Sequence, residues 1–147
     1  MNEEDASAKV SETFFDAMDI ARRVKGRENP GTLTVMSNLA DILLEEGRYT
    51  EAEKLIRETL DIRRRVRGPE IPETAEATYN LGRMAPLQGS HTEALSLLRQ
   101  ALDHGLKPAD ALDMEKNPRL KSLHGAPGFD ALVADAKQRV AAAQRPK

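Results

Sequence analysis

The chain has 147 residues, a length that suits one compact domain or a few stacked helix pairs. Apolar residues make up 39% and aromatic residues only 3%, so the core must consist of aliphatic side chains, a composition that favours helices. The formal net charge of -2 provides no overall field for a polyanion or an anionic membrane, so we expect no nucleic-acid or membrane partner.

The absence of cysteine excludes a disulfide framework, a thiolate zinc site and a cysteine nucleophile. The first ten residues, MNEEDASAKV, are acidic and lack the regions of a secretory signal. No apolar stretch approaches the roughly 20 residues that span a bilayer. The sequence therefore predicts a soluble protein in the cytoplasm.

Residues 8–27 are expected to form a lone helix that belongs to a partial repeat. Phe14, Met18 and Arg22 in this segment register with Ile56, Leu60 and Arg64, one period further along the chain. A helix without its hairpin partner leaves an apolar face open, which favours self-association.

An internal repeat follows, because a shift of 42 residues places 17 identical residues over the 40 positions from Arg22 to Asp61. Such a period is typical of solenoids. We expect repeat 1 at residues 28–68 and repeat 2 at residues 70–105, each a helix hairpin. The matched pairs include Pro30/Pro72, Thr32/Thr74, Asn38/Asn80, Leu39/Leu81, Gly47/Gly89, Glu51/Glu93, Ala52/Ala94, Leu55/Leu97 and Leu60/Leu102.

Proline and glycine mark the ends of the predicted helices. Pro30 and Pro72 lie where a first helical turn tolerates a missing N–H, and Gly47 and Gly89 lie at the breaks between helices. Small residues at matched positions, Ala40, Gly82, Ala52 and Ala94, let the helix axes approach closely.

Repeat 2 departs from repeat 1 at two positions. His91 stands in the place of Tyr49. Pro86 falls inside the expected first helix, where it removes a backbone hydrogen bond and crowds the carbonyl of Gly82, so we expect a kink.

The period is lost after Gly105, and residues 106–143 are expected to form a helical C-terminal cap of three short to medium helices. Pro108, Pro118 and Pro127 each suggest a first turn, and Asn117 is placed to cap the second helix. The last helix has one apolar face, made of Phe129, Leu132, Val133, Ala136 and Val140. The whole chain is thus predicted to be a single all-α domain, an α-solenoid of stacked antiparallel helix hairpins with a helical cap.

The stretch NPGTLTVMSNLADILLEEGRYTEAEKLIRETLDIRRRVRGPEIPETAEATYNLGRMAPLQGSHTEALSLLRQAL resembles the tetratricopeptide repeats of the long, kinesin-light-chain-like type. Asn-Leu, Gly, Glu-Ala and an Arg-rich link recur in register, and the resemblance covers roughly residues 8–104. Asn117 to Leu132 also resembles a closing element that follows such repeats in bacterial proteins.

The resemblance implies that the first helix of each repeat lines a concave, peptide-binding groove. In repeat 1 the implied contacts are Thr34, Ser37, Asn38, Asp41 and Glu45. In repeat 2 they are Glu76, Tyr79, Asn80, Arg83 and Leu87.

Several of these residues have a second, structural interpretation. Asn38 and Asn80 offer a donor and an acceptor to an extended peptide backbone, or they fix the repeat geometry. Arg83 is a candidate for pairing with a ligand carboxylate, or it forms a weak surface ion pair. Tyr79 packs against a bound side chain or fills the stack.

Neither catalysis nor metal or cofactor binding is expected. His91, His104 and His124 are scattered, and no phosphate-binding glycine loop or nucleophile elbow occurs. The cluster Arg63, Arg64, Arg65 and Arg67 lacks interleaved aromatics, so it is interpreted as a solvated helix end.

The leading hypothesis is therefore a non-catalytic scaffold that binds a peptide or a segment of a partner protein. Two alternatives stay open: a structural piece that self-associates through its N-terminal helix, and a regulatory segment of a larger signalling enzyme.

Overall fold

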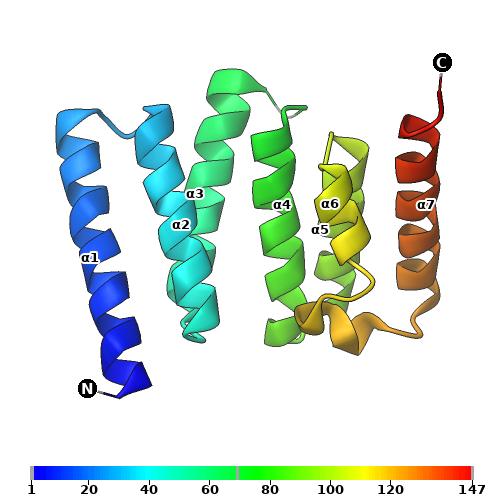
Figure 1. Ribbon diagram of the computed structural model, residues 1–147, viewed down its shortest axis with the longest axis horizontal. Coiled ribbons are helices and arrows are strands. Elements are labelled where there is room, and N and C mark those ends of the chain that lie inside the picture. The colour runs from blue at the N-terminus through cyan, green and yellow to red at the C-terminus, as the bar shows by residue number, and fades with distance from the viewer. Residues whose placement is uncertain (1, 69, 147) are drawn as a thin grey trace. The chain divides into compact units, whose positions relative to one another are not determined.

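In the computed structural model, residues 2–68 and 70–146 are described, and they form helices joined by short turns, with no strand among them (Figure 1). This confirms the predicted all-α fold class. The elements are α1 (Glu3–Val24), α2 (Pro30–Glu45), α3 (Tyr49–Arg67), α4 (Pro72–Met84), the 3₁₀ helix η1 (Ala85–Gln88), α5 (His91–Asp103), α6 (Pro108–Asp113), the 3₁₀ helix η2 (Pro118–Leu123) and α7 (Pro127–Ala143). They form two compact units, Met1–Val66 and Arg67–Lys147.

Several helices begin at the prolines that the sequence singled out, but α1 begins at Glu3 and ends at Val24, so it starts five residues before the expected segment 8–27. Proline occupies the first turn of six of the described elements, at Pro30, Pro72, Pro86, Pro108, Pro118 and Pro127. The side chain of Asn117 caps η2, as predicted, because its Oδ1 accepts from the Arg119 N–H at 3.0 Å. Gly47 ends the α2 segment with φ +77°, a left-handed conformation that disfavours any residue with a Cβ.

In the first unit, α1 packs on the α2–α3 hairpin and is fastened near both of its ends. Near the end of α1, Arg22 forms an ion pair with Glu58 of α3 at 3.0 Å. Near its start, Ser7 donates its hydroxyl to Glu46 Oε1 at 2.8 Å. Further along the helix, Arg48 from the α2–α3 turn donates to Ser11 Oγ at 3.3 Å. The guanidinium of Arg48 also lies 5.6 Å from the centre of the Phe15 ring. The apolar side chains buried in this unit are Met18, Leu33, Met36, Leu39, Ala40, Leu43, Leu44, Ala52, Leu55, Ile56, Leu60 and Ile62.

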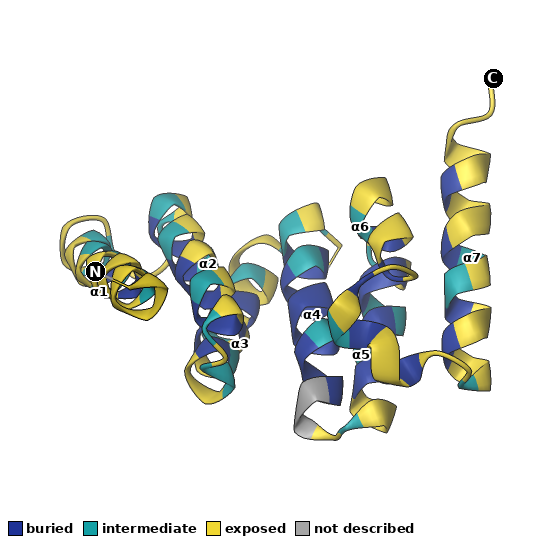
Figure 2. Ribbon diagram, turned by 60° about the horizontal axis from the view of Figure 1, so that its bottom comes forward, coloured by how far each residue is buried: buried dark blue, intermediate teal, exposed yellow. Residues whose placement is uncertain are grey.

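In the second unit, α4 and α5 form the hairpin and α7 packs on α5 and α6. Gly82 lets α4 and α5 come close, since a Cβ at this position would lie 2.9 Å from Leu98 Cδ2. Buried side chains from all three C-terminal helices, including Met114, Leu123 and Phe129, join the hairpin in one cluster. Figure 2 shows the buried sides of these helices turned toward one another.

Pro86 does not produce the kink that the sequence suggested. The α-helix ends at Met84, and the chain continues as η1 with Pro86 in its first turn. Because proline has no N–H to donate to Gly82 and crowds its carbonyl, the chain tightens into a 3₁₀ turn instead of bending a continuous helix. This turn packs against α5 and against η2.

We predict that Gly82→Ala destabilises the protein. At an open helical site this change would add about 1 kcal/mol of stability. At Gly82 the new methyl group would meet buried Leu98, and the strain should lower the free energy of unfolding by about 1–3 kcal/mol. Urea unfolding followed by circular dichroism measures the change.

Gly128→Ala is the matched control, because its Cβ would meet only the half-buried Leu95 side chain, with Cδ1 at 3.3 Å. An equal loss of stability in the two variants, or a gain at Gly82, would contradict the close-packing argument.

Candidate interaction surfaces

One face of α2 presents a row of polar side chains to solvent. Thr34, Asn38, Asp41 and Glu45 are exposed, and Ser37 beside them is half-buried. Their spacing of three and four residues places them on one side of the helix. The opposite side carries Met36, Leu39 and Leu43, which are completely buried, so the hydrophobic core fixes the direction of the polar row.

Asn38 is the most available member of this row. Its side chain makes no hydrogen bond with any other residue that the structure describes, so both amide groups face water. Thr34, by contrast, donates its hydroxyl to the Pro30 carbonyl at 3.0 Å, one turn back on its own helix. The row therefore contains one free amide next to a carboxylate at Asp41.

The corresponding face of α4 is arranged differently, because Tyr79 is buried. The Tyr79 hydroxyl donates to Asp113 Oδ2 at 2.8 Å, and the Asn117 side-chain amide donates to the same oxygen at 2.6 Å. Burial and, after it, this hydrogen bond to a carboxylate raise the pKa of the Tyr79 phenol far above its usual range. Tyr79 thus ties α4 to the segment between α6 and η2.

Asn80 and Arg83 complete a cluster around Tyr79. The Arg83 guanidinium lies 5.2 Å from the centre of the Tyr79 ring and donates to Asn80 Oδ1. Asn80 is buried, Arg83 is half-buried, and Glu76 is half-buried one turn earlier. The side chain of Leu87 lies outside the described residues. Asn38 and Asn80, although matched in sequence, therefore differ in environment.

Sequence reasoning missed Asp113 as part of this cluster. Asp113 lies beyond the repeats, 34 residues from Tyr79, so no repeat register connects the two. The loss of period after Gly105 and the prolines that follow indicated only that a different structure begins there. The 3₁₀ turn at Pro86 packs against η2, the next described helical element after Asp113.

Three of the basic side chains at the links between helices have acidic neighbours. Arg65 pairs with Glu28, Arg67 lies 3.8 Å from Glu73, and Arg22 bonds Glu58 on a different helix. These pairs agree with the interpretation of the Arg-rich segments as solvated helix ends.

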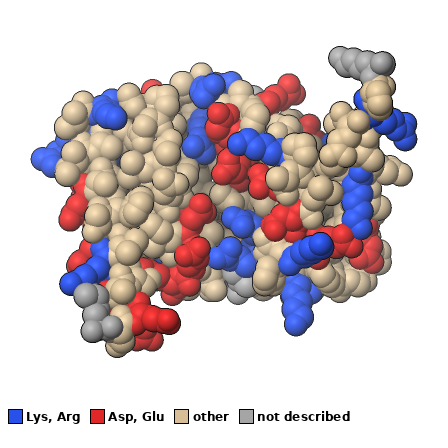
Figure 3. Space-filling view, viewed as in Figure 1, with Lys and Arg blue, Asp and Glu red and all other residues tan. Residues whose placement is uncertain are grey.

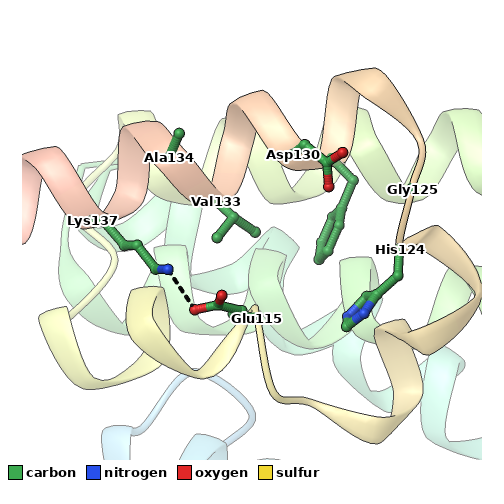
Figure 4. A pocket seen from close by; sticks show the side chains of 8 residues that line it. Glu115, His124, Gly125, Asp130, Val133, Ala134 and Lys137 are labelled. Atoms are coloured by element: carbon green, nitrogen blue, oxygen red, sulfur yellow. Dashed lines mark ion pairs between the residues drawn. The ribbon is translucent and has the colours of Figure 1, made fainter.

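A shallow pocket of about 450 Å³ opens along α7 and is lined by Glu115, His124, Gly125, Phe129, Asp130, Val133, Ala134 and Lys137 (Figure 4). The His124 ring stacks on Phe129 with centroids 5.4 Å apart. Lys137 bonds Glu115 at 2.7 Å, and this hydrogen bond lowers the pKa of the Glu115 carboxyl. Lys137 and Glu115, two of the charged side chains that line the pocket, are therefore paired with each other.

No group of three or more His, Cys, Asp or Glu side chains among the described residues is placed to hold a metal ion. None of the described helices has the length and apolar character needed to cross a membrane.

The geometry defines the class of protein: antiparallel helix pairs of one repeated length, with a helical segment packed on the last pair. Residues 35–105 match the tetratricopeptide repeat family model, which confirms the resemblance seen in the sequence. The solved structure of BtubC (BKLC) from P. vanneervenii superimposes with a TM-score of 0.76 at 23% sequence identity, covering 97% of this chain and 60% of that chain. The chain therefore spans about three fifths of BtubC, and the likeness shows a shared fold.

A search of the curated proteins finds no match. The family-model match therefore identifies tetratricopeptide repeats within residues 35–105, and the structural likeness to BtubC shows the fold alone. Tetratricopeptide repeats generally mediate protein–protein interaction.

We predict that Tyr79 makes the stability of the protein fall at alkaline pH. Its folded-state pKa is raised, so its contribution is fully present below the unfolded-state pKa of about 10 and is lost as pH rises above that value. Tyr79→Phe should flatten the dependence of the urea midpoint on pH between about 9 and 11.

Tyr49→Phe, at the only other tyrosine, is the control and should leave the alkaline slope in place. A slope that is unchanged by Tyr79→Phe would show that the buried phenol is not the titrating group.

Proposed function

We propose that this chain is a non-catalytic scaffold that holds a segment of a partner protein on the exposed polar row of α2. Glu76 and Arg83, which are half-buried on α4, offer a further set of contacts. The observation that carries the proposal is the open polar row on α2, with the unpaired amide of Asn38 at its centre. A cytoplasmic location, expected from the cysteine-free sequence, is part of the proposal.

The α2 row suits an extended polypeptide. An amide side chain donates to a peptide carbonyl and accepts from a peptide N–H. Asn38 therefore binds the backbone of a partner segment independently of the side chains that the segment carries. Ser37 adds a hydroxyl beside it, and Thr34 can accept a hydrogen bond while its own proton stays on the Pro30 carbonyl. Asp41 and Glu45 give this half of the surface a negative charge, so a basic partner segment is favoured over an acidic one.

On α4, the guanidinium of Arg83 contributes a positive charge that neighbouring side chains hold in place. Arg83 is fixed by the Tyr79 ring and by Asn80, so it loses little rotamer freedom when it binds a carboxylate. In this proposal Tyr79 and Asn80 position Arg83, which makes the contact. Glu76 lies one turn earlier and adds an acceptor for a donor on the partner.

We predict that a photo-reactive amino acid at position 38 cross-links the partner segment, because α2 presents this position to solvent. Mass spectrometry of the adduct identifies the segment, and a synthetic peptide of that sequence is then titrated by calorimetry. The control carries the same amino acid at position 138, an exposed site on α7. Equal adducts at both positions would indicate nonspecific capture.

We further predict that Asn38→Ala weakens binding of that peptide by about threefold to thirtyfold, the effect of one or two lost hydrogen bonds. Because the Asn38 side chain is exposed, the unfolding midpoint should not change. Substituting Asn38, Asn80 and Arg83 together by alanine should abolish measurable binding. Affinity that survives the triple change rules out this surface, provided that circular dichroism shows a folded chain.

A further inference from the structure

The two terminal helices of the chain are anchored in different ways. Of the 17 residues of α7, four are buried, and all four are apolar: Phe129, Leu132, Ala136 and Val140. Of the 22 residues of α1, all of which the structure describes, only Ser11 and Met18 are buried. A helix with so few buried apolar side chains gains little from packing, and segments of this kind open while the rest of a protein stays folded.

A polar network holds the first half of α1. The Ser7 hydroxyl donates to Glu46 Oε1 at 2.8 Å, and one turn further on Ser11 Oγ accepts from Arg48 at 3.3 Å. Arg48 also donates to Glu46 Oε2 at 3.2 Å, which links the two contacts, and its guanidinium lies over the half-buried Phe15 ring. We call Ser7, Ser11, Glu46 and Arg48 the Arg48 network.

The start of α1 does not close tightly on the end of α2. A hollow of about 510 Å³ remains there, lined by Glu3, Glu4, Ser7, Ala8, Glu45, Glu46 and Arg48. Four of these side chains are carboxylates, and Figure 3 shows acidic side chains gathered near the start of α1 and the end of α2. Like charges oppose closure, so Arg48, the single basic side chain in this lining, is needed to keep this end of α1 in place.

The helix α1 covers an apolar stripe of α2. Arg22 Nη2 lies 3.9 Å from Met36 Sδ toward one end of α2, and Glu46 meets α1 at the other end. Leu39 and Leu43 lie on the same side of α2, because the spacing from Met36 to Glu46 is three, four and three residues. Met36, Leu39 and Leu43 are completely buried. Departure of α1 would therefore expose three large apolar side chains.

We propose that α1 is a releasable strap. It leaves the α2–α3 hairpin while the hairpin stays folded, the Arg48 network holds it closed, and its release exposes Met36, Leu39 and Leu43. The first unit thereby has a closed state, in which the apolar stripe is covered, and an open state, in which the stripe reaches solvent. The Arg48 network sets the balance between the two states.

This proposal does not rest on the proposed function, because the polar row around Asn38 lies on the opposite side of α2 from the stripe. Cross-linking at position 38 should be the same whether α1 is open or closed. Failure of either proposal is therefore visible without reference to the other.

Hydrogen exchange of the full chain, followed by mass spectrometry, tests the release. We expect the amides of α1 to exchange through a common opening that is at least about tenfold more frequent than the openings of α2 and α3. The double variant Ser7→Ala/Ser11→Ala should speed the exchange of α1 by about threefold to thirtyfold, the effect of one or two lost hydrogen bonds. Alanine favours a helix more than serine does, so faster exchange would not reflect a weaker helix.

Two control variants separate release of α1 from other openings. Thr13→Ala removes an exposed hydroxyl that donates to the Lys9 carbonyl within α1, and it should not speed exchange. Gly47→Ala strains the α2–α3 turn, where φ is +77° and a Cβ would have no neighbour within 4 Å. It should speed exchange in α2 and α3 and leave α1 unchanged, because the hairpin is intact in both states of the strap.

The exchange data overturn the proposal in either of two cases. In the first, α1 of the natural chain exchanges no faster than α2 and α3. In the second, Gly47→Ala speeds α1 as much as it speeds the hairpin, which would mean that the three helices open together.

Thiol labelling tests whether release uncovers the stripe, since the natural chain has no cysteine. Met36→Cys places a thiol beneath α1, and Ala101→Cys places one at a completely buried position of the second unit. Adding Ser7→Ala/Ser11→Ala should raise the labelling rate at position 36 by the factor found for α1 exchange and leave position 101 unchanged. Leu43→Cys replaces Met36→Cys if circular dichroism shows that the latter does not fold. Labelling beneath α1 that does not follow α1 exchange, or an equal rise at position 101, overturns the proposal.

Discussion

Each helix pair in this protein depends on two helix axes approaching closely enough to share a single layer of aliphatic side chains. With few aromatic residues and no cysteine, the chain has few large rings and no disulfide to bridge a wider gap. Close approach requires small residues at the crossing, and Gly82 against Leu98 shows how little space is left. It also requires abrupt turns, which the left-handed glycines at positions 47 and 89 supply. The direction in which each polar side chain points follows from this packing, because the buried side of each helix determines the exposed side.

The two first helices diverge because of one proline. In α2 the helix continues to Glu45, whereas α4 stops at Met84 and its last turn becomes η1. The 3₁₀ turn packs against η2, and the same C-terminal segment supplies Asp113 to the Tyr79 hydroxyl. Residues that match in sequence thereby acquire different chemistry: Asn38 stays free in water, and Asn80 becomes a buried support for Arg83. A single backbone constraint thus changes the surface that the second repeat offers.

Much of the fold was predictable because it is encoded locally. Several signals act within one helical turn: proline in a first turn, glycine at the break between two helices, and Asn117 as a cap. The 42-residue repeat then places the same proline and glycine signals in both hairpins. The Tyr79–Asp113 contact was not predictable, because it joins a repeat residue to a segment outside the period. The covered side of α1 was not predictable either, since the sequence does not tell which of its apolar residues the hairpin covers. The repeat predicted the positions of the candidate contact residues along the two helices, but it did not predict how deeply each of them is buried.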